Sequence, residues 1–343
     1  MADHNHFQSR WFTASHRRPW RLLAGFVLLG FVLLNVLAYR HAGAMLTYQS
    51  GGERPPAPGS LSWSEKLRVL ACGVTVPRPT NRRTPQELGL QGKPIRFQAA
   101  DGVNLEGWVI SPPEPHGTVL LFHGYSASRS TMIDEADEFF ELGYAVVLID
   151  FRGCGGSDGT TTTLGYREAA DVAAAVEQTR SLNLPRPIIL FGPSMGGAAI
   201  LRSIAVHNVR PDAVIIESVF GSMAGAVRNR FDVMRVPSFP AAELLVFWGG
   251  VQVGFSGFEH NPVDYARFCA MPTLVLHGDA DRMARPVEGR AIYDALTGPK
   301  ELAWFAGADH VAMHSADPER WRTVVSHFLN RHIPNSVTEK MPR

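Results

Sequence analysis

The sequence has few cysteines and little net charge. Its 343 residues include three cysteines, Cys72, Cys154 and Cys269, which are far apart and form no Cys-x-x-Cys pair. Neither a zinc site nor a disulfide framework is indicated, and buried free thiols are the simpler interpretation. The formal net charge is +1, without a basic patch interleaved with aromatic residues. Nothing therefore indicates binding to nucleic acid.

Sequence motifs for cofactors and metals are also missing. The chain has no Walker phosphate loop, no Gly-x-Gly-x-x-Gly dinucleotide fingerprint and no His-Glu-x-x-His pair. We accordingly expect neither a metal nor a cofactor. With 45% hydrophobic and 19% charged residues, the composition is typical of a packed globular protein and not of a disordered one.

One long apolar run is present near the N-terminus. Residues 22–39 carry no charged side chain, and as a helix these 18 residues would reach ~27 Å, close to the thickness of a bilayer core. Four arginines and one acid occur in residues 1–21. This bias predicts a cytoplasmic N-terminal segment at 1–21, a transmembrane anchor at 22–39 and the remaining chain outside the cytoplasmic membrane.

A cleaved signal peptide is the alternative for this run. Ala42-Gly43-Ala44 resembles a small-residue cleavage site, but the apolar run is longer than the usual core of a signal peptide. A retained anchor is therefore favoured. Residues 40–92 read as a linker and packing segment, with a Gly- and Pro-rich stretch at 49–60 and a short helix from Trp63 to Leu70. We expect this segment to pack against the base of the following domain.

Short apolar runs alternate with helical stretches from Lys93 onward. A hairpin is predicted around Asp101-Gly102, and six later runs are apolar on both faces, as in parallel strands covered by helices. The predicted strands are Thr118–Phe122, Ala145–Ile149, Pro187–Phe191, Ala213–Ile216, Thr273–Leu276 and Leu302–Phe305. This alternation predicts a doubly wound α/β domain at 93–332, followed by a flexible tail at 333–343.

One connection between predicted strands is longer than an ordinary connection in such a fold. Residues 219–267 lie between two predicted strands and are interpreted as a cap or lid insertion. Its middle contains an apolar cluster with Phe247 and Trp248. We expect the underside of this lid, including these two aromatic residues, to line an acyl pocket, and simple packing on the domain is the alternative.

The stretch from Leu190 to Ile200 predicts a nucleophile. Gly192-x-Ser194-x-Gly196 follows a predicted strand and precedes a helix-compatible run. This pattern is typical of a tight strand-to-helix turn that lifts a serine hydroxyl out of a sheet. A Cβ at either flanking glycine would crowd the reversing chain.

A serine hydroxyl needs a base, and the base needs an orienting group. After Ser194 the chain offers two acids, Asp279 and Asp281, at the end of one predicted strand, and His310 at the end of the next. Ser…Asp…His is the chain order of the α/β-hydrolase fold. His314 is a rival base. His123 and His277 each follow a strand, precede a glycine and are interpreted as structural hydrogen-bonding residues.

The motifs of residues 93–332 resemble the α/β-hydrolase superfamily. The loops HGYSAS, DFRGCGGSDG and HGDADRMARP and the elbow GPSMGG look most like the membrane-anchored Bem46-like hydrolases. The resemblance implies that Ser194 is the nucleophile, Asp281 the orienting acid and His310 the base. It also implies an oxyanion hole from the backbone N–H groups of Tyr125 and Met195.

The expected function is that of a membrane-anchored serine hydrolase. We expect it to cleave carboxylic esters, with thioesters or amides as further substrates, through an acyl-enzyme on a small-molecule or lipid-like ester. A serine peptidase of the same fold, or a membrane-tethered binding or scaffold protein without turnover, are the alternatives. No second domain is available to select peptides, which favours the esterase.

Overall fold

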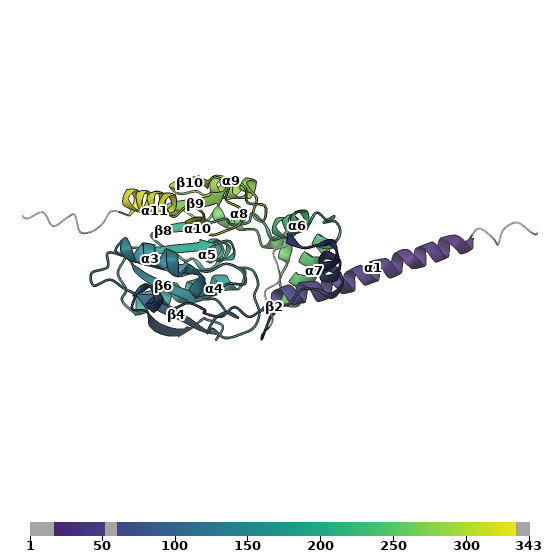
Figure 1. Ribbon diagram of the computed structural model, residues 1–343, viewed down its shortest axis with the longest axis horizontal. Coiled ribbons are helices and arrows are strands. Elements are labelled where there is room, and N and C mark those ends of the chain that lie inside the picture. The colour runs from purple at the N-terminus through teal and green to yellow at the C-terminus, as the bar shows by residue number, and fades with distance from the viewer. Residues whose placement is uncertain (1–16, 52–59, 334–343) are drawn as a thin grey trace, which may run out of the picture.

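An eight-stranded sheet forms the centre of the protein (Figure 1). The computed structural model describes residues 17–51 and 60–333, so the predictions for residues 1–16, 52–59 and 334–343 lie outside the described chain. The strand order is β10-β9-β8-β7-β5-β6-β4-β3; β4 is antiparallel to both neighbours and the other pairs are parallel. The strands are β3 (Lys93–Gln98), β4 (Asn104–Ile110), β5 (Thr118–Phe122), β6 (Ala145–Asp150), β7 (Ile188–Pro193), β8 (Ala213–Glu217), β9 (Thr273–Gly278) and β10 (Lys300–Phe305).

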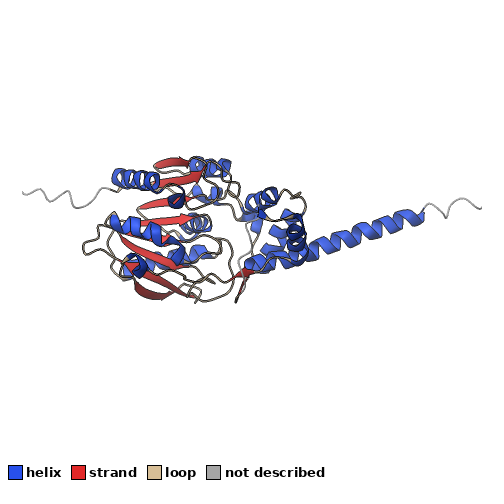
Figure 2. Ribbon diagram, viewed as in Figure 1, coloured by secondary structure: helices blue, strands red, loops and turns tan. Residues whose placement is uncertain are grey.

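Helices cover both faces of this sheet, which confirms the predicted α/β fold (Figure 2). One buried cluster joins the sheet to α3 (Ile133–Glu141) and α11 (Pro318–His332). A second joins the other face to α4 (Glu168–Ser181), α5 (Met195–His207) and α9 (Pro286–Ala295). The central strands are buried along their whole length, which is why their sequences are apolar on both faces. Short helices η3 (Arg129–Met132) and α10 (Met313–Ala316) precede α3 and α11.

The N-terminal helix α1 (Arg17–Leu46) is longer than the predicted anchor. In the described chain it is the one helix long and apolar enough to cross a membrane. Large apolar side chains between Trp20 and Val36 are exposed, whereas Ala38, Ala42 and Leu46 are buried. These three residues share one face of the helix, so the helix continues past residue 39 because its last turns pack on the rest of the protein. Figure 1 shows the first part of α1 projecting away from the domain.

The prediction that the segment after α1 packs against the base of the domain is wrong. It contains β1 (Tyr48–Gln49), α2 (Trp63–Cys72), β2 (Val76–Pro77) and η2 (Pro85–Leu88). Arg78 donates to the carbonyl of Gly159 at 2.6 Å, and Ser128 Oγ donates to the carbonyl of Thr80 at 3.1 Å. The segment therefore contacts the loops that follow β6 and β5, at the carboxyl edge of the sheet. Tyr48 and Val76 bury their side chains with Cys154 there, which explains the placement.

The insertion between β8 and β9 is helical and lies between the sheet and α1 (Figure 1). It contains α6 (Met223–Met234), α7 (Ala241–Val253), η4 (Gly257–Glu259) and α8 (Pro262–Ala266). Helix α7 packs against α6 on one side and against α1 on the other. The insertion is therefore placed between the carboxyl edge of the sheet and the apolar N-terminal helix.

Two buried carboxyl groups, those of Glu217 and Glu135, lie near the carboxyl end of strand β8. Glu217 ends β8 and accepts a hydrogen bond from the indole N–H of Trp321 at 2.7 Å. Glu135 of α3 is also buried. Burial raises the pKa of Glu217 from its usual value near 4.5 to about 7. Burial, together with repulsion from Glu217, raises the pKa of Glu135 to about 8.

These raised pKa values predict that Glu135 and Glu217 stabilise the protein less as the pH rises. Between about pH 5 and 8 the folded state retains protons on Glu135 and Glu217 that the unfolded chain releases, so the contribution of these two groups to the free energy of unfolding falls with pH. We expect the midpoint of thermal unfolding of Glu217→Gln, measured relative to that of the wild type, to rise from pH 5 to pH 8. Glu177→Gln, at a side chain that is 72% exposed on α4, is the matched control. An unchanged slope in Glu217→Gln would contradict the pKa assignment.

Candidate active site

Ser194 lies on a sharp turn between β7 and α5. Its backbone has φ 49° and ψ −113°, and its N–H donates to the carbonyl of Glu217 at 2.7 Å. A Cβ at Gly192 would lie 2.7 Å from the carbonyl carbon of Gly196, and a Cβ at Gly196 would overlap the carbonyl oxygen of Phe122. Only glycine fits at these two positions. The strained backbone of Ser194 is held by the packed elements around it.

A chain of hydrogen bonds connects Ser194 to His310 and Asp281. Ser194 Oγ lies 3.2 Å from His310 Nε2, and His310 Nδ1 lies 2.8 Å from Asp281 Oδ2. The other carboxylate oxygen of Asp281 accepts the backbone N–H groups of Met283 and Ala284, each at 2.8 Å. With Asp281 so held, Nδ1 of His310 carries the proton and Nε2 is free to accept one from the serine.

The other acid and histidines of the sequence analysis have their own hydrogen-bond partners. Asp279 accepts the N–H of Gly307 at 2.6 Å, and His314 lies 3.4 Å from Glu138. His123 accepts the N–H of Phe151 at 3.1 Å. His277 contacts the carbonyl of Ala284 at 2.8 Å. Burial lowers the pKa of both His123 and His277, which keeps these imidazoles neutral. The structure thus brings Asp281 and His310, and not their rivals, to Ser194.

Tyr125 and Met195 lie beside the serine because β5 and β7 are neighbours in the sheet. Both line the same pocket as Ser194 and His310. Met195 begins α5, so its N–H has no acceptor within the helix. The Tyr125 hydroxyl donates to the carbonyl of Met45, near the end of α1, at 2.7 Å. The N-terminal helix therefore helps to position the loop that follows β5.

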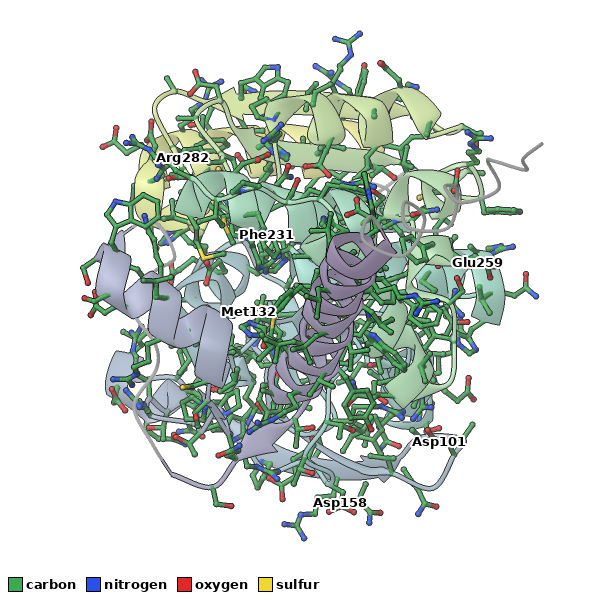
Figure 3. All side chains as sticks on the ribbon, turned by 90° about the vertical axis from the view of Figure 1, so that its right-hand side faces the viewer. Asp101, Met132, Asp158, Phe231, Glu259 and Arg282 are labelled. Atoms are coloured by element: carbon green, nitrogen blue, oxygen red, sulfur yellow. The ribbon has the colours of Figure 1, made fainter. Side chains whose placement is uncertain are left out.

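Two adjoining cavities open at this place. The space between atoms is about 360 Å³ in the Ser194 pocket and about 620 Å³ in the α1–α7 chamber, and both volumes include open solvent. Leu164, Met223 and Arg230 line both cavities, so the two meet along these side chains. The chamber is walled by α1, α6 and α7, and its remaining lining is almost wholly apolar. In Figure 3 helix α1 points toward the viewer, in front of the domain.

The expectation that Phe247 and Trp248 line an acyl pocket is wrong. Phe247 is 49% exposed. The indole N–H of Trp248 donates to Asn35 Oδ1 of α1 at 3.0 Å, and its ring packs edge-on against Tyr39. Neither residue lines either cavity. Both lie on the parts of α7 that face solvent and α1, while Val246 and Gly250 face the interior.

Two features of the site have no counterpart among the sequence-based predictions. The last turns of α1 line the chamber through Ala42, Met45 and Leu46. Arg230 of α6 lies where the cavities meet. The spacing of Met223, Val227 and Arg230 on one helix face is the only sequence signal that could have placed this arginine.

The fold agrees with comparisons to known proteins. The family described as "Serine aminopeptidase, S33" matches residues 113–239. The esterase Pf2001 of Pyrococcus furiosus aligns with a TM-score of 0.65 and 25% identity over 76% of this chain and 98% of that one. The chain has the α/β-hydrolase fold, and residues 113–239 match this hydrolase family.

The relatives of this chain include one whose name describes it as a membrane protein. YqkD of Bacillus subtilis is 24% identical over 68% of this chain and 77% of that protein. The "Uncharacterized membrane protein YNL320W" of Saccharomyces cerevisiae is 27% identical over 62% of this chain and 70% of that one. The S33 match includes Tyr125 and Ser194 but ends before Asp281 and His310. The closer resemblance to Bem46-like proteins stays a prediction.

Proposed function

We propose that this α/β hydrolase is a membrane-anchored serine esterase that forms an acyl-enzyme. The observation that carries the proposal is the hydrogen-bonded chain Ser194–His310–Asp281 in a pocket that meets an apolar chamber. A binding protein would need neither the strained serine nor the oriented imidazole. Esters are the main substrates proposed, and thioesters and amides could follow the same steps.

The proposed reaction follows from the positions of these atoms. His310 Nε2 takes the proton of Ser194 Oγ, and the oxygen attacks the carbonyl carbon of the ester. The resulting oxyanion is held by the N–H groups of Met195 and Tyr125, which typically contribute a few kcal/mol. His310 then returns the proton to the departing alcohol. Water, deprotonated in its turn by His310, attacks the acyl-enzyme, and His310 passes this proton to the departing Ser194 Oγ as the acid is released.

The α1–α7 chamber supports an acyl group of more than a few carbons. It adjoins the Ser194 pocket at Leu164 and Met223, which line both, and α6 and α7 contribute apolar side chains to its wall. Each buried CH₂ contributes about 0.8 kcal/mol to binding. We therefore propose that the acyl chain lies in this chamber, in place of the site under Phe247 and Trp248.

A serine peptidase is the second candidate, because the matching family is described as a serine aminopeptidase. An aminopeptidase must accept the positive ammonium group of a peptide close to its nucleophile. Among the described residues that line the Ser194 pocket, the permanently charged side chain is Arg230, a cation. Like charges at such short range are unfavourable, so the pocket supports the esterase better.

Helix α1 supports a retained anchor. Ala42-Gly43-Ala44, the possible cleavage site, lies within the helix, and Ala42 is 4% exposed against the cap. Phe239, Phe247 and Val251 of the cap region are exposed and would lie near the membrane surface beside α1. We propose that the N-terminus is cytoplasmic and residues 40–343 are extracytoplasmic, from the arginine bias of residues 1–21.

Substitutions in the triad test the proposed chemistry. We expect Ser194→Ala and His310→Ala each to lower kcat for p-nitrophenyl esters by about 10⁴-fold or more, because the three groups act as a unit. Asp281→Asn should be nearly as damaging and Asp279→Asn much milder. Labelling by a fluorophosphonate should be lost in Ser194→Ala while its circular dichroism stays that of the wild type. Equal effects at Asp279 and Asp281 would refute the assignment of the acid, and labelling of Ser194→Ala would refute the nucleophile.

A bulkier side chain in the chamber tests where the acyl chain lies. Val227→Phe should displace two or three CH₂ groups, which corresponds to about a 15- to 60-fold loss in the ratio of kcat/KM for decanoate over acetate esters. Val251→Phe, at a side chain of α7 that is 54% exposed, makes the same change outside the chamber and should keep the ratio. If both variants change the ratio equally, the chain does not occupy the chamber.

Reporter fusions test the orientation in the membrane. Alkaline phosphatase folds to an active enzyme only where its disulfides form. A bacterial fusion after Gly59 should therefore be active and one after Arg18 inactive. Activity in the reverse pattern would place the hydrolase domain in the cytoplasm.

A further inference from the structure

Arg230 lies at the junction of the two cavities. On α6, Met223, Val227 and Arg230 face the α1–α7 chamber, and Met223, Ala226 and Arg230 face the Ser194 pocket. The spacing of three and four residues places them on one side of the helix. The guanidinium group is therefore held beside the path from the nucleophile to the chamber.

This guanidinium has little compensation from the protein. Within the described chain Arg230 makes one hydrogen bond, from Nη1 to the carbonyl of Ala226 at 3.1 Å, and no carboxylate lies within 4 Å of it. Arg228, two residues earlier, is paired with Glu243 of α7 at 2.8 Å. An arginine has five N–H donors, so most of those of Arg230 are available to a ligand in the cavities.

The surroundings make this charge unfavourable without a ligand. Arg230 is half-buried among apolar side chains, and burial lowers the pKa of its guanidinium. The group nevertheless keeps its proton at neutral pH. A partly buried cation without a carboxylate partner is unfavourable, and an anion that binds there would stabilise it.

We propose that Arg230 selects substrates by binding an anionic group on the alcohol part of the ester. The inference rests on the proposed esterase function and deepens it. With the acyl chain in the chamber and the carbonyl at Ser194, the alcohol part remains in the Ser194 pocket, where Arg230 provides paired N–H donors. A phosphate matches these donors in charge and geometry. The substrate class is a long-chain monoacyl ester of a phosphorylated alcohol, which reaches the chamber from the membrane beside α1.

Two esters with the same acyl chain test this inference in the full-length protein. The substrates are 1-decanoylglycerol 3-phosphate and uncharged 1-decanoylglycerol, and the readout is kcat/KM from released decanoate. A charge-assisted contact of this kind should favour the phosphate ester by about 10- to 100-fold. Arg230→Met should remove most of this preference, and Arg230→Lys should restore part of it. Arg235→Gln, at an exposed residue that ends the same helix, removes the same charge away from the cavities and should keep the preference.

Fluorophosphonate labelling separates a failure of the inference about Arg230 from a failure of the proposed serine hydrolase function. The probe is uncharged, so labelling of Arg230→Met shows that the variant is folded and its serine reactive. If the wild type labels but cleaves the neutral ester as well as the phosphate ester, or cleaves neither, the inference about Arg230 is wrong while the serine hydrolase stands. Equal ester ratios in the wild type and Arg230→Met also overturn it. If the wild type does not label, the proposed function itself fails, and the inference fails with it.

Discussion

The site depends on the close approach of α5 to the end of β5. A side chain at Gly196 would overlap the carbonyl of Phe122, so the start of α5 reaches its position only because this residue has no Cβ. That approach places Met195 and Tyr125 at one pocket and turns the Ser194 hydroxyl toward His310. The strained backbone of the serine is stable because rigid elements hold it on both sides: a buried strand before it and a buried helix after it.

The sheet and the arrangement around Ser194 could be predicted because their signals are local. Buried strands are short runs apolar on both faces, and chemically active residues directly after such strands meet at one edge of the sheet. These signals predict that Ser194, the two acids Asp279 and Asp281, and His310 lie at the same edge of the sheet. The choice between Asp279 and Asp281 needed the family resemblance, because both follow the same strand and only the fold shows which one faces the imidazole.

Contacts between distant segments could not be predicted in this way. Trp248 bonds to Asn35, 213 residues earlier, and neither neighbourhood contains a sign of the other. An apolar helix such as α7 offers several faces, so its composition does not tell which face lines a cavity. Arg230 reads from sequence as an ordinary charged residue on a helix surface. Its place between two cavities appears only when α6, α7 and α1 are assembled.

The end of α1 belongs to the folded domain. Its last turns are buried against α7, and its Met45 carbonyl holds the hydroxyl of Tyr125. If α1 spans a bilayer as proposed, this rigid joint sets the height and tilt of Ser194 above the lipid surface. Bilayers differ in thickness, and a helix adapts to a thicker or thinner one by changing its tilt. The distance from Ser194 to the lipid surface would then vary with membrane thickness. The lipid composition of the membrane would therefore change turnover without any lipid contacting the site.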